Sequence, residues 1–144
     1  MNKQLTWIAY QKLERLRNEE LPHRAFRVAN ELRNAEMDVL AKGGRGGRVY
    51  RIPGTRKYYT ASAPGEVPAV RTGVFRLSWR PKHFRIGDEY QSRIESSYNV
   101  GGYNLGALLE NGSPRGQLAP RPHHEKILER AKPKALKIYR EPYF

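Results

Sequence analysis

Apolar residues recur at helical spacing through the first 42 residues of the chain. Leu5, Ile8, Leu13 and Leu16 lie near one face of a helix that we predict over residues 3–19. A second stripe has spacings of three and four, and its members are Ala25, Val28, Ala29, Leu32, Ala35 and Val39. It predicts a second helix over residues 22–42. Pro22 suits the first turn of that helix, and Gly43-Gly44 ends it.

The helical period is lost over residues 43–71. The run Gly43–Arg48 predicts a flexible loop without regular structure. The segments 49–52 and 56–60 then flank Pro53-Gly54, a pair typical of a type II turn, so we expect a β-hairpin here. The proline-rich residues 63–69 predict a stiff, extended connector. We call residues 43–71 the basic arm.

Alternation of apolar and polar residues begins at Phe75 and predicts a strand, although Thr72-Gly73 is equally compatible with a short helical turn at that point. Gly87-Asp88 joins a hairpin of residues 76–86 and 89–98. Residues 103–110 indicate a short helix that ends at Asn111-Gly112.

Pro122 opens the last predicted helix, which Pro133 is expected to kink or split. The apolar side expected for this helix consists of Ile127, Leu128, Ala131, Leu136 and Tyr139. The aromatic tail 141–144 is expected to be exposed unless a partner covers it. The pattern as a whole predicts an α+β protein with N-terminal helices, an extended hairpin arm, a small antiparallel sheet packed by helices, and a C-terminal helix.

The composition indicates a small apolar core and a positive charge that is unevenly distributed along the chain. The 144 residues suit a single domain, residues 1–144, but only 38% of them are apolar and the net charge is +13. Residues 43–86 carry 10 basic side chains and 1 acidic side chain, Glu66, which leaves +9 in that block alone. A solvated helix face would interleave its charges. We therefore interpret the block as a surface that meets something negative.

Signatures of catalysis are lacking from the sequence. There is no cysteine, no nucleophile elbow and no phosphate-binding loop with its Lys-Ser/Thr. His123 and His124 would point about 100° apart on a helix, so we expect exposed histidines and no metal site. We predict that the chain is not an enzyme and needs no cofactor. It also lacks an apolar run long enough for a transmembrane helix or a secretory signal, so we expect no membrane association.

Two interpretations of the basic arm follow from its residues. Arginines interleaved with tyrosines are typical of nucleic-acid binding through phosphate contacts and base stacking. The same residue types are enriched in protein interfaces, which favours an arm that reaches a neighbouring subunit. The residues concerned are Arg45, Arg48, Tyr50, Arg51, Arg56, Lys57, Tyr58 and Tyr59.

Residues 61–78 resemble the centre of a family of small structural proteins of long-tailed bacteriophages, the tail-completion, tail-terminator or head–tail joining (neck) proteins. The family has an Ala-Ser-x-Pro-Gly-Glu-x-Pro-Ala stretch, then Thr-Gly, then an apolar residue and Ser. Looser matches follow in order at residues 104–112 and 119–122. The residues of the connector that carry the resemblance are Ala63, Pro64, Gly65, Glu66, Pro68, Thr72 and Gly73.

The resemblance implies a structural virion protein that forms a homo-oligomeric ring at the phage head–tail junction, typically a hexamer at the tail end, with a dodecamer as the alternative nearer the portal. Its partners would be the tail tube protein and the head-closure or connector protein, with DNA passing through the channel. Assembly would take place in the host cytoplasm. The alternative from the residues alone is a basic nucleic-acid-binding module.

Overall fold

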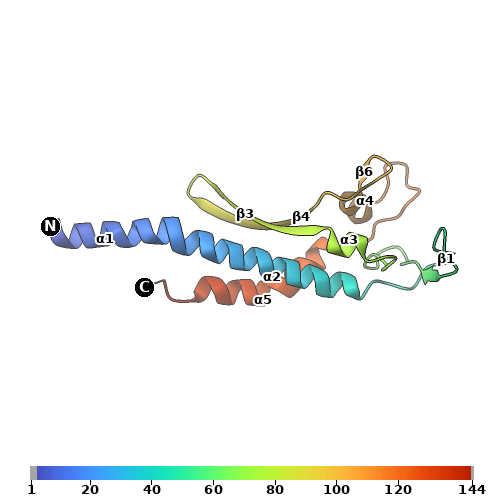
Figure 1. The fold of residues 1–144 in the computed structure, drawn as a ribbon, viewed down its shortest axis with the longest axis horizontal. Coiled ribbons are helices and arrows are strands. Elements are labelled where there is room, and N and C mark those ends of the chain that lie inside the picture. Colours follow the sequence, from blue (N-terminus) through green and yellow to red (C-terminus); the bar gives the residue numbers. More distant parts are fainter. Residues whose placement is uncertain (1–2, 144) are drawn as a thin grey trace.

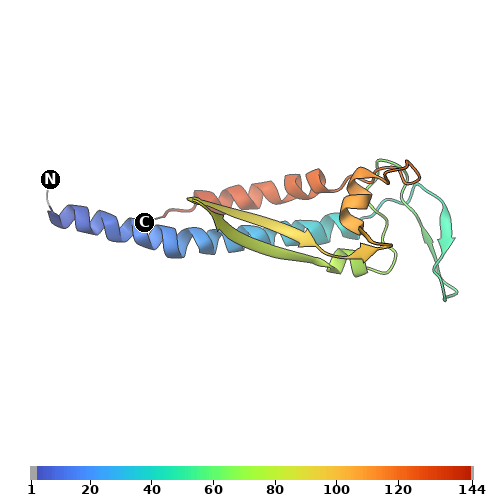
Figure 2. The ribbon, with the colours of Figure 1, turned by 90° about the horizontal axis from the view of Figure 1, so that it is seen from above.

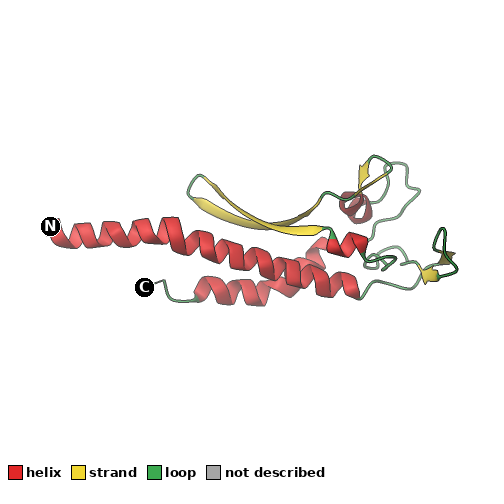
Figure 3. Cartoon of the chain, viewed as in Figure 1, coloured by secondary structure: helices red, strands yellow, loops and turns green. Residues whose placement is uncertain are grey.

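The computed structural model describes residues 3–143, and for Leu5 only the backbone. Figure 1 shows an elongated molecule in which a long N-terminal helical rod lies beside the C-terminal helix. A β-hairpin covers the rod on the opposite side, and smaller elements gather at one end. Figure 3 shows that this end contains most of the loops. The fold is mixed α+β, as the sequence predicts.

The N-terminal rod is one continuous helical run rather than the two helices predicted. Helix α1 (Lys3–Arg15) leads through a π-helical turn, η1 (Leu16–Glu20), into α2 (Leu21–Ala41). In the π-helical pattern the carbonyl of Arg17 would accept from position 22, but Pro22 has no N–H. The Tyr90 hydroxyl donates to that carbonyl instead. The proline is therefore accommodated without a break in the helix.

Helix α2 is the centre of the packing. Its predicted stripe is largely confirmed, because Ala25, Val28, Ala29 and Ala35 are buried. Figures 1 and 2 show α2 between the long hairpin and helix α5 (His124–Arg140). In the described part of the chain, alanine supplies four of the nine buried apolar side chains. The core is as lean as the composition predicts.

Helix α5 faces α2 with a different set of residues from the one expected. Ile127 and Ala131 are buried as predicted, but Ile138 completes the stripe, while Leu128 is 59% exposed. Positions 127, 131 and 138 fall within about 40° on a helical wheel, whereas 128 and 136 lie about 100° and 180° away from 127. The helix runs through Pro133 as a single element, so the predicted split is not found.

Within residues 3–143, the β structure consists of three separate two-stranded antiparallel hairpins. Strands β1 (Val49–Arg51) and β2 (Tyr58–Thr60) form the predicted arm hairpin. The Thr55 N–H donates to the Ile52 carbonyl across Pro53-Gly54, and Gly54 has a φ of 74°, as a type II turn requires. The long hairpin pairs β3 (Trp79–Ile86) with β4 (Glu89–Ser96), again as predicted.

The remaining elements are short. Helix α3 (Val74–Leu77) is the helical turn that was one of the two predictions for the segment at Phe75. Strands β5 (Asn99–Val100) and β6 (Tyr103–Asn104) form the third hairpin. Helix α4 (Leu105–Asn111) begins later than predicted, because the Asn104 side chain accepts from the Ala107 N–H at 3.0 Å and caps it.

The tail is held in place, contrary to the predicted exposure. The buried Arg24 guanidinium donates to the carbonyls of Glu141 and Pro142, both at 2.7 Å. It also lies 3.6 Å from the centre of the Tyr143 ring. Arg27 forms two hydrogen bonds with the Glu141 carboxylate, at 2.7 and 2.8 Å. Arg24 therefore ties α2 to the end of α5. Phe144 lies outside the described residues.

Candidate functional site

The connector packs against the glycine-rich start of the basic arm. The Glu66 Oε2 atom accepts the N–H groups of Ala63 at 2.9 Å and Gly46 at 3.0 Å. These two backbone donors, Ala63 first, lower the pKa of Glu66 despite its partial desolvation. The only acidic residue of the basic block is thus used inside the fold.

Residues 43–47 form no helix or strand, as predicted, but they are not a free loop. Gly44 N–H donates to the Val67 carbonyl at 2.9 Å, and Gly47 N–H to the Ala61 carbonyl at 2.8 Å. The two backbones approach so closely that a Cβ at Gly43 would lie 2.4 Å from the Pro68 carbonyl oxygen. These glycines are required for contact between two segments.

Gly43→Ala is expected to destabilise the chain by about 2 kcal/mol, the usual cost of overpacking, because the added methyl group meets backbone rather than a movable side chain. A shift in the thermal melting temperature measures this. Arg45→Ala, in the same segment but exposed, is the matched control and should melt like the unmodified chain. Equal melting of all three proteins would contradict the packed junction.

A third segment, residues 118–121, completes this junction. The Gly65 N–H donates to the Pro120 carbonyl at 3.0 Å. Arg121 donates to the Ser62 hydroxyl at 3.0 Å and to the Ser62 carbonyl at 3.1 Å. Ser62 is buried, and Arg121 is half-buried over it. The sequence analysis missed Arg121, whose only signal was its position inside the third segment of the family resemblance.

The connector also lines an apolar groove of about 580 Å³ at the end of the molecule that carries α3 and α4. Pro68, Thr72 and Gly73 of the connector motif contribute to one side of it. Three arginines and no acidic residue are among its lining residues, and the Arg76 Nε atom is buried without a hydrogen-bond partner within residues 3–143. The other apolar lining residues include Val70, Val74, Phe75, Tyr98, Val100 and Leu105.

The arm residues divide into two groups around the hairpin. Tyr50 and Tyr59 are cross-strand partners whose rings stack with centroids 5.9 Å apart. Arg45, Lys57, Tyr58 and Tyr59 line a second hollow of about 750 Å³, together with Lys42 and Arg71. The remaining members of the predicted set are exposed, do not line this hollow, and are Arg48, Tyr50, Arg51 and Arg56.

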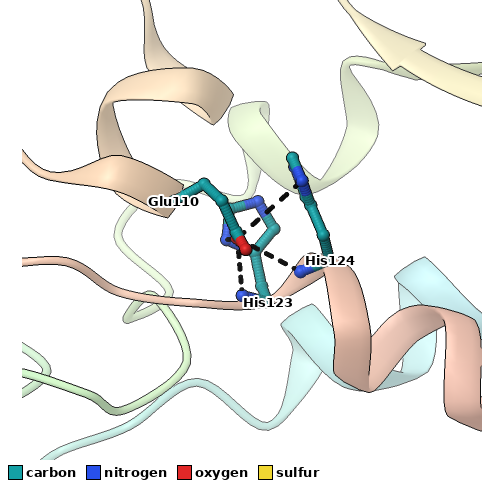
Figure 4. Close-up of side chains that lie close together, drawn as sticks. All are labelled: Glu110, His123 and His124. Atoms are coloured by element: carbon teal, nitrogen blue, oxygen red, sulfur yellow. Dashed lines mark hydrogen bonds and ion pairs between the residues drawn. The ribbon is translucent and has the colours of Figure 1, made fainter.

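Glu110, His123 and His124 come together although the sequence predicts no such cluster (Figure 4). His123 is fully buried, and its Nδ1 atom lies 3.1 Å from Glu110 Oε2. His124 is exposed as predicted, but the prediction was wrong for His123, which precedes α5 and is not helical, with φ −143° and ψ −22°. The carboxylate comes from α4, 13 residues earlier in the chain.

The arrangement of this cluster is that of a helix cap. Glu110 Oε2 accepts the backbone N–H of His123 at 2.8 Å and that of His124 at 3.2 Å, and His123 Nδ1 contacts the Arg121 carbonyl at 2.9 Å. Burial alone would raise the pKa of Glu110, but the two N–H donors and the histidine rings lower it overall. The partial positive charge of a helix N-terminus favours this carboxylate and opposes a cation.

Glu110→Gln is therefore expected to cost about 1 kcal/mol of stability at pH 7, the typical value of a helix cap. Chemical denaturation followed by circular dichroism measures it. Glu125→Gln, in the first turn of α5 but exposed, should cost much less. A rise of more than a few degrees in melting temperature with one equivalent of Zn²⁺ would contradict the cap and indicate a metal site.

Comparison of the chain with models of known protein families, with curated proteins and with solved structures finds no match in any of the three. The family resemblance of residues 61–78 therefore remains a prediction from the sequence. Within residues 3–143, no helix combines the length and apolar character needed to cross a bilayer.

Proposed function

We propose that this protein is a ring-forming structural subunit of a phage head–tail junction, of the neck or tail-completion type, located in the virion. The observation that carries the proposal is apolar surface that the described chain does not cover itself. Helix α1 projects beyond the body (Figure 2), and Trp7, Tyr10 and Leu13, which follow one another at spacings of three, are 56%, 58% and 60% exposed. Apolar surface of this kind marks interaction sites in soluble proteins.

The apolar groove supports the same proposal. It lies at the opposite end of the molecule from α1, since α3 and α4 are far from the N-terminus in Figures 1 and 2. Two different uncovered surfaces at opposite ends suit a head-to-tail contact between copies. Such contacts form closed rings when the rotation between subunits closes. The connector motif, on which the family resemblance rests, lines part of this groove.

Native mass spectrometry of the purified chain over a range of concentrations tests the proposal, with negative-stain images as a second measurement. We expect a ring, a hexamer in preference to a dodecamer, either alone or with a tail tube protein. Trp7→Glu combined with Leu13→Glu should abolish the ring and leave the fold of the monomer unchanged, because both side chains are exposed. A strict monomer under all these conditions would overturn the proposal.

The arm is tested separately with Arg51→Glu combined with Arg56→Glu. Both residues are exposed, so this double variant should fold normally. If the arm reaches a neighbouring subunit or an acidic partner protein, ring formation or head–tail joining should fall. If joining stays at the level of the unmodified chain, the arm is not part of the interface. That result would not contradict the ring itself.

A further inference from the structure

The hollow beside the arm hairpin is unusual in its charge. It lies between the end of α2, the glycine-rich segment, the hairpin β1–β2 and residues 70–71, which follow the connector. Among the residues that the structure describes, four cationic side chains line it, and no Asp or Glu does. The cations are Lys42, Arg45, Lys57 and Arg71.

None of these four cations forms an ion pair with a carboxylate of residues 3–143 at 4.0 Å or less. The Arg71 guanidinium lies 5.7 Å from the centre of the Tyr59 ring, a contact that leaves its charge uncompensated. Glu66, the nearest acid in sequence, is engaged by the backbone N–H groups of Ala63 and Gly46. Four like charges in one concave surface repel one another and attract an anion.

Two tyrosines complete the lining. Tyr58 is 66% exposed at the edge of the hairpin, and Tyr59 lies between the hollow and the apolar groove. Aromatic rings interleaved with cations along a concave surface are the arrangement that binds a nucleic-acid strand, since cations meet phosphates and rings stack on bases. The surface of an acidic protein usually carries lysines among its carboxylates. Those lysines would find no acidic partner in the lining of this hollow, which favours a nucleic acid over an acidic protein.

We infer that this hollow binds the sugar–phosphate backbone of DNA. Lys42, Arg45, Lys57 and Arg71 neutralise successive phosphates, and Tyr58 stacks on a base where the strand is single. The inference does not rest on the proposed ring, because the hollow is built entirely from one chain.

Fluorescence anisotropy with a labelled 20-nucleotide single strand and with the corresponding 20-base-pair duplex tests the inference between 50 and 200 mM salt. With four phosphates neutralised, the slope of log K against log salt should be about −3.6 for the duplex and about −2.8 for the single strand. Duplex affinity should therefore fall on the order of 150-fold across that range.

The decisive variant is Lys57→Ala combined with Arg71→Ala. It should reduce the size of the duplex slope by about 1.8, because two phosphate contacts are lost. Lys132→Ala combined with Arg140→Ala removes the same charge from exposed positions on α5 and should leave the slope unchanged. Tyr58→Ala should weaken the single strand more than the duplex.

Circular dichroism melting of each variant checks that folding is intact. We expect no loss of stability, because all five side chains are exposed. Equal slopes for both double variants would overturn the inference and assign DNA binding to net charge. Tighter binding of polyglutamate than of DNA at 150 mM salt would also overturn it, in favour of an acidic protein partner. Native mass spectra of the DNA-binding variants report the ring independently, so failure of either idea is recognisable on its own.

Discussion

Arg24→Ala is expected to destabilise the chain by about 3 kcal/mol, the range found when one partner of a buried charged network is removed. The Arg24 side chain is 3% exposed. It donates to the carbonyl of Ile138 at 3.1 Å as well as to those of Glu141 and Pro142. Truncation removes the side-chain donor from the carbonyls of Glu141 and Pro142 and opens a cavity between α2 and the tail.

The position of Arg24 adds an electrostatic contribution. Its guanidinium lies at the C-terminal end of α5, where the helix dipole favours a cation. Arg24→Lys keeps the charge but has fewer donors in a less suitable geometry, so its loss of stability should be intermediate. Denaturant unfolding at pH 7 gives all three values.

Arg27→Ala is the matched control for this prediction. Arg27 is three residues along the same helix and contacts the same tail through Glu141, but both partners are more than a third exposed. Its loss is expected to be less than about 1 kcal/mol. Equal losses for the two alanine variants would show that Arg24 does not hold the tail through its buried bonds.

The pattern of the sequence was sufficient to predict those helices and strands whose signals are local in the chain. The stripe from Ala25 to Val39 predicted the buried face of α2, and Gly87-Asp88 predicted the turn of the long hairpin. The break predicted at Pro22 was wrong because the compensating donor is Tyr90, which is 73 residues away from Arg17 in the chain. No local pattern reports such a partner.

The candidate site was predicted less completely, for a related reason. The glycines of residues 43–47 suggested flexibility, and their close contact with the connector becomes visible only when both segments are placed. Glu110 and the two histidines are likewise joined across a loop. The charge of the arm, in contrast, was predictable from the sequence, since two of the four cations that line the basic hollow, Arg45 and Lys57, belong to the predicted set.

Glu36→Gln is expected to stabilise the chain at pH 8 by about 3 kcal/mol. This free energy corresponds to a difference of roughly two units or more between the pKa of Glu36 in the folded chain and in the unfolded chain. Glu36 is fully buried on α2, and neither of its carboxylate oxygens has a hydrogen-bond partner within the described residues. Burial raises the pKa of Glu36 to about 7, while the charges of Arg33 and Arg76 oppose the rise. Arg33 Nε is 3.9 Å from the carboxylate.

The sign of the pH dependence follows from this raised pKa. The folded chain holds the Glu36 proton more tightly than the unfolded chain, whose carboxyl has a pKa near 4.5. The contribution of Glu36 to stability is therefore fully present below about pH 4.5 and is lost as the pH rises through 7. Glutamine is neutral throughout, so the difference between the two proteins should be small at pH 5 and largest at pH 8.

Unfolding by urea at pH 5, 6, 7 and 8 measures this difference directly, and comparison with the unmodified chain at each pH cancels the titration of all other groups. Asp38→Asn, on the exposed side of the same helix, should differ from the unmodified chain by less than about 1 kcal/mol at every pH. A constant difference for Glu36→Gln across the range would show that the carboxyl is charged when folded.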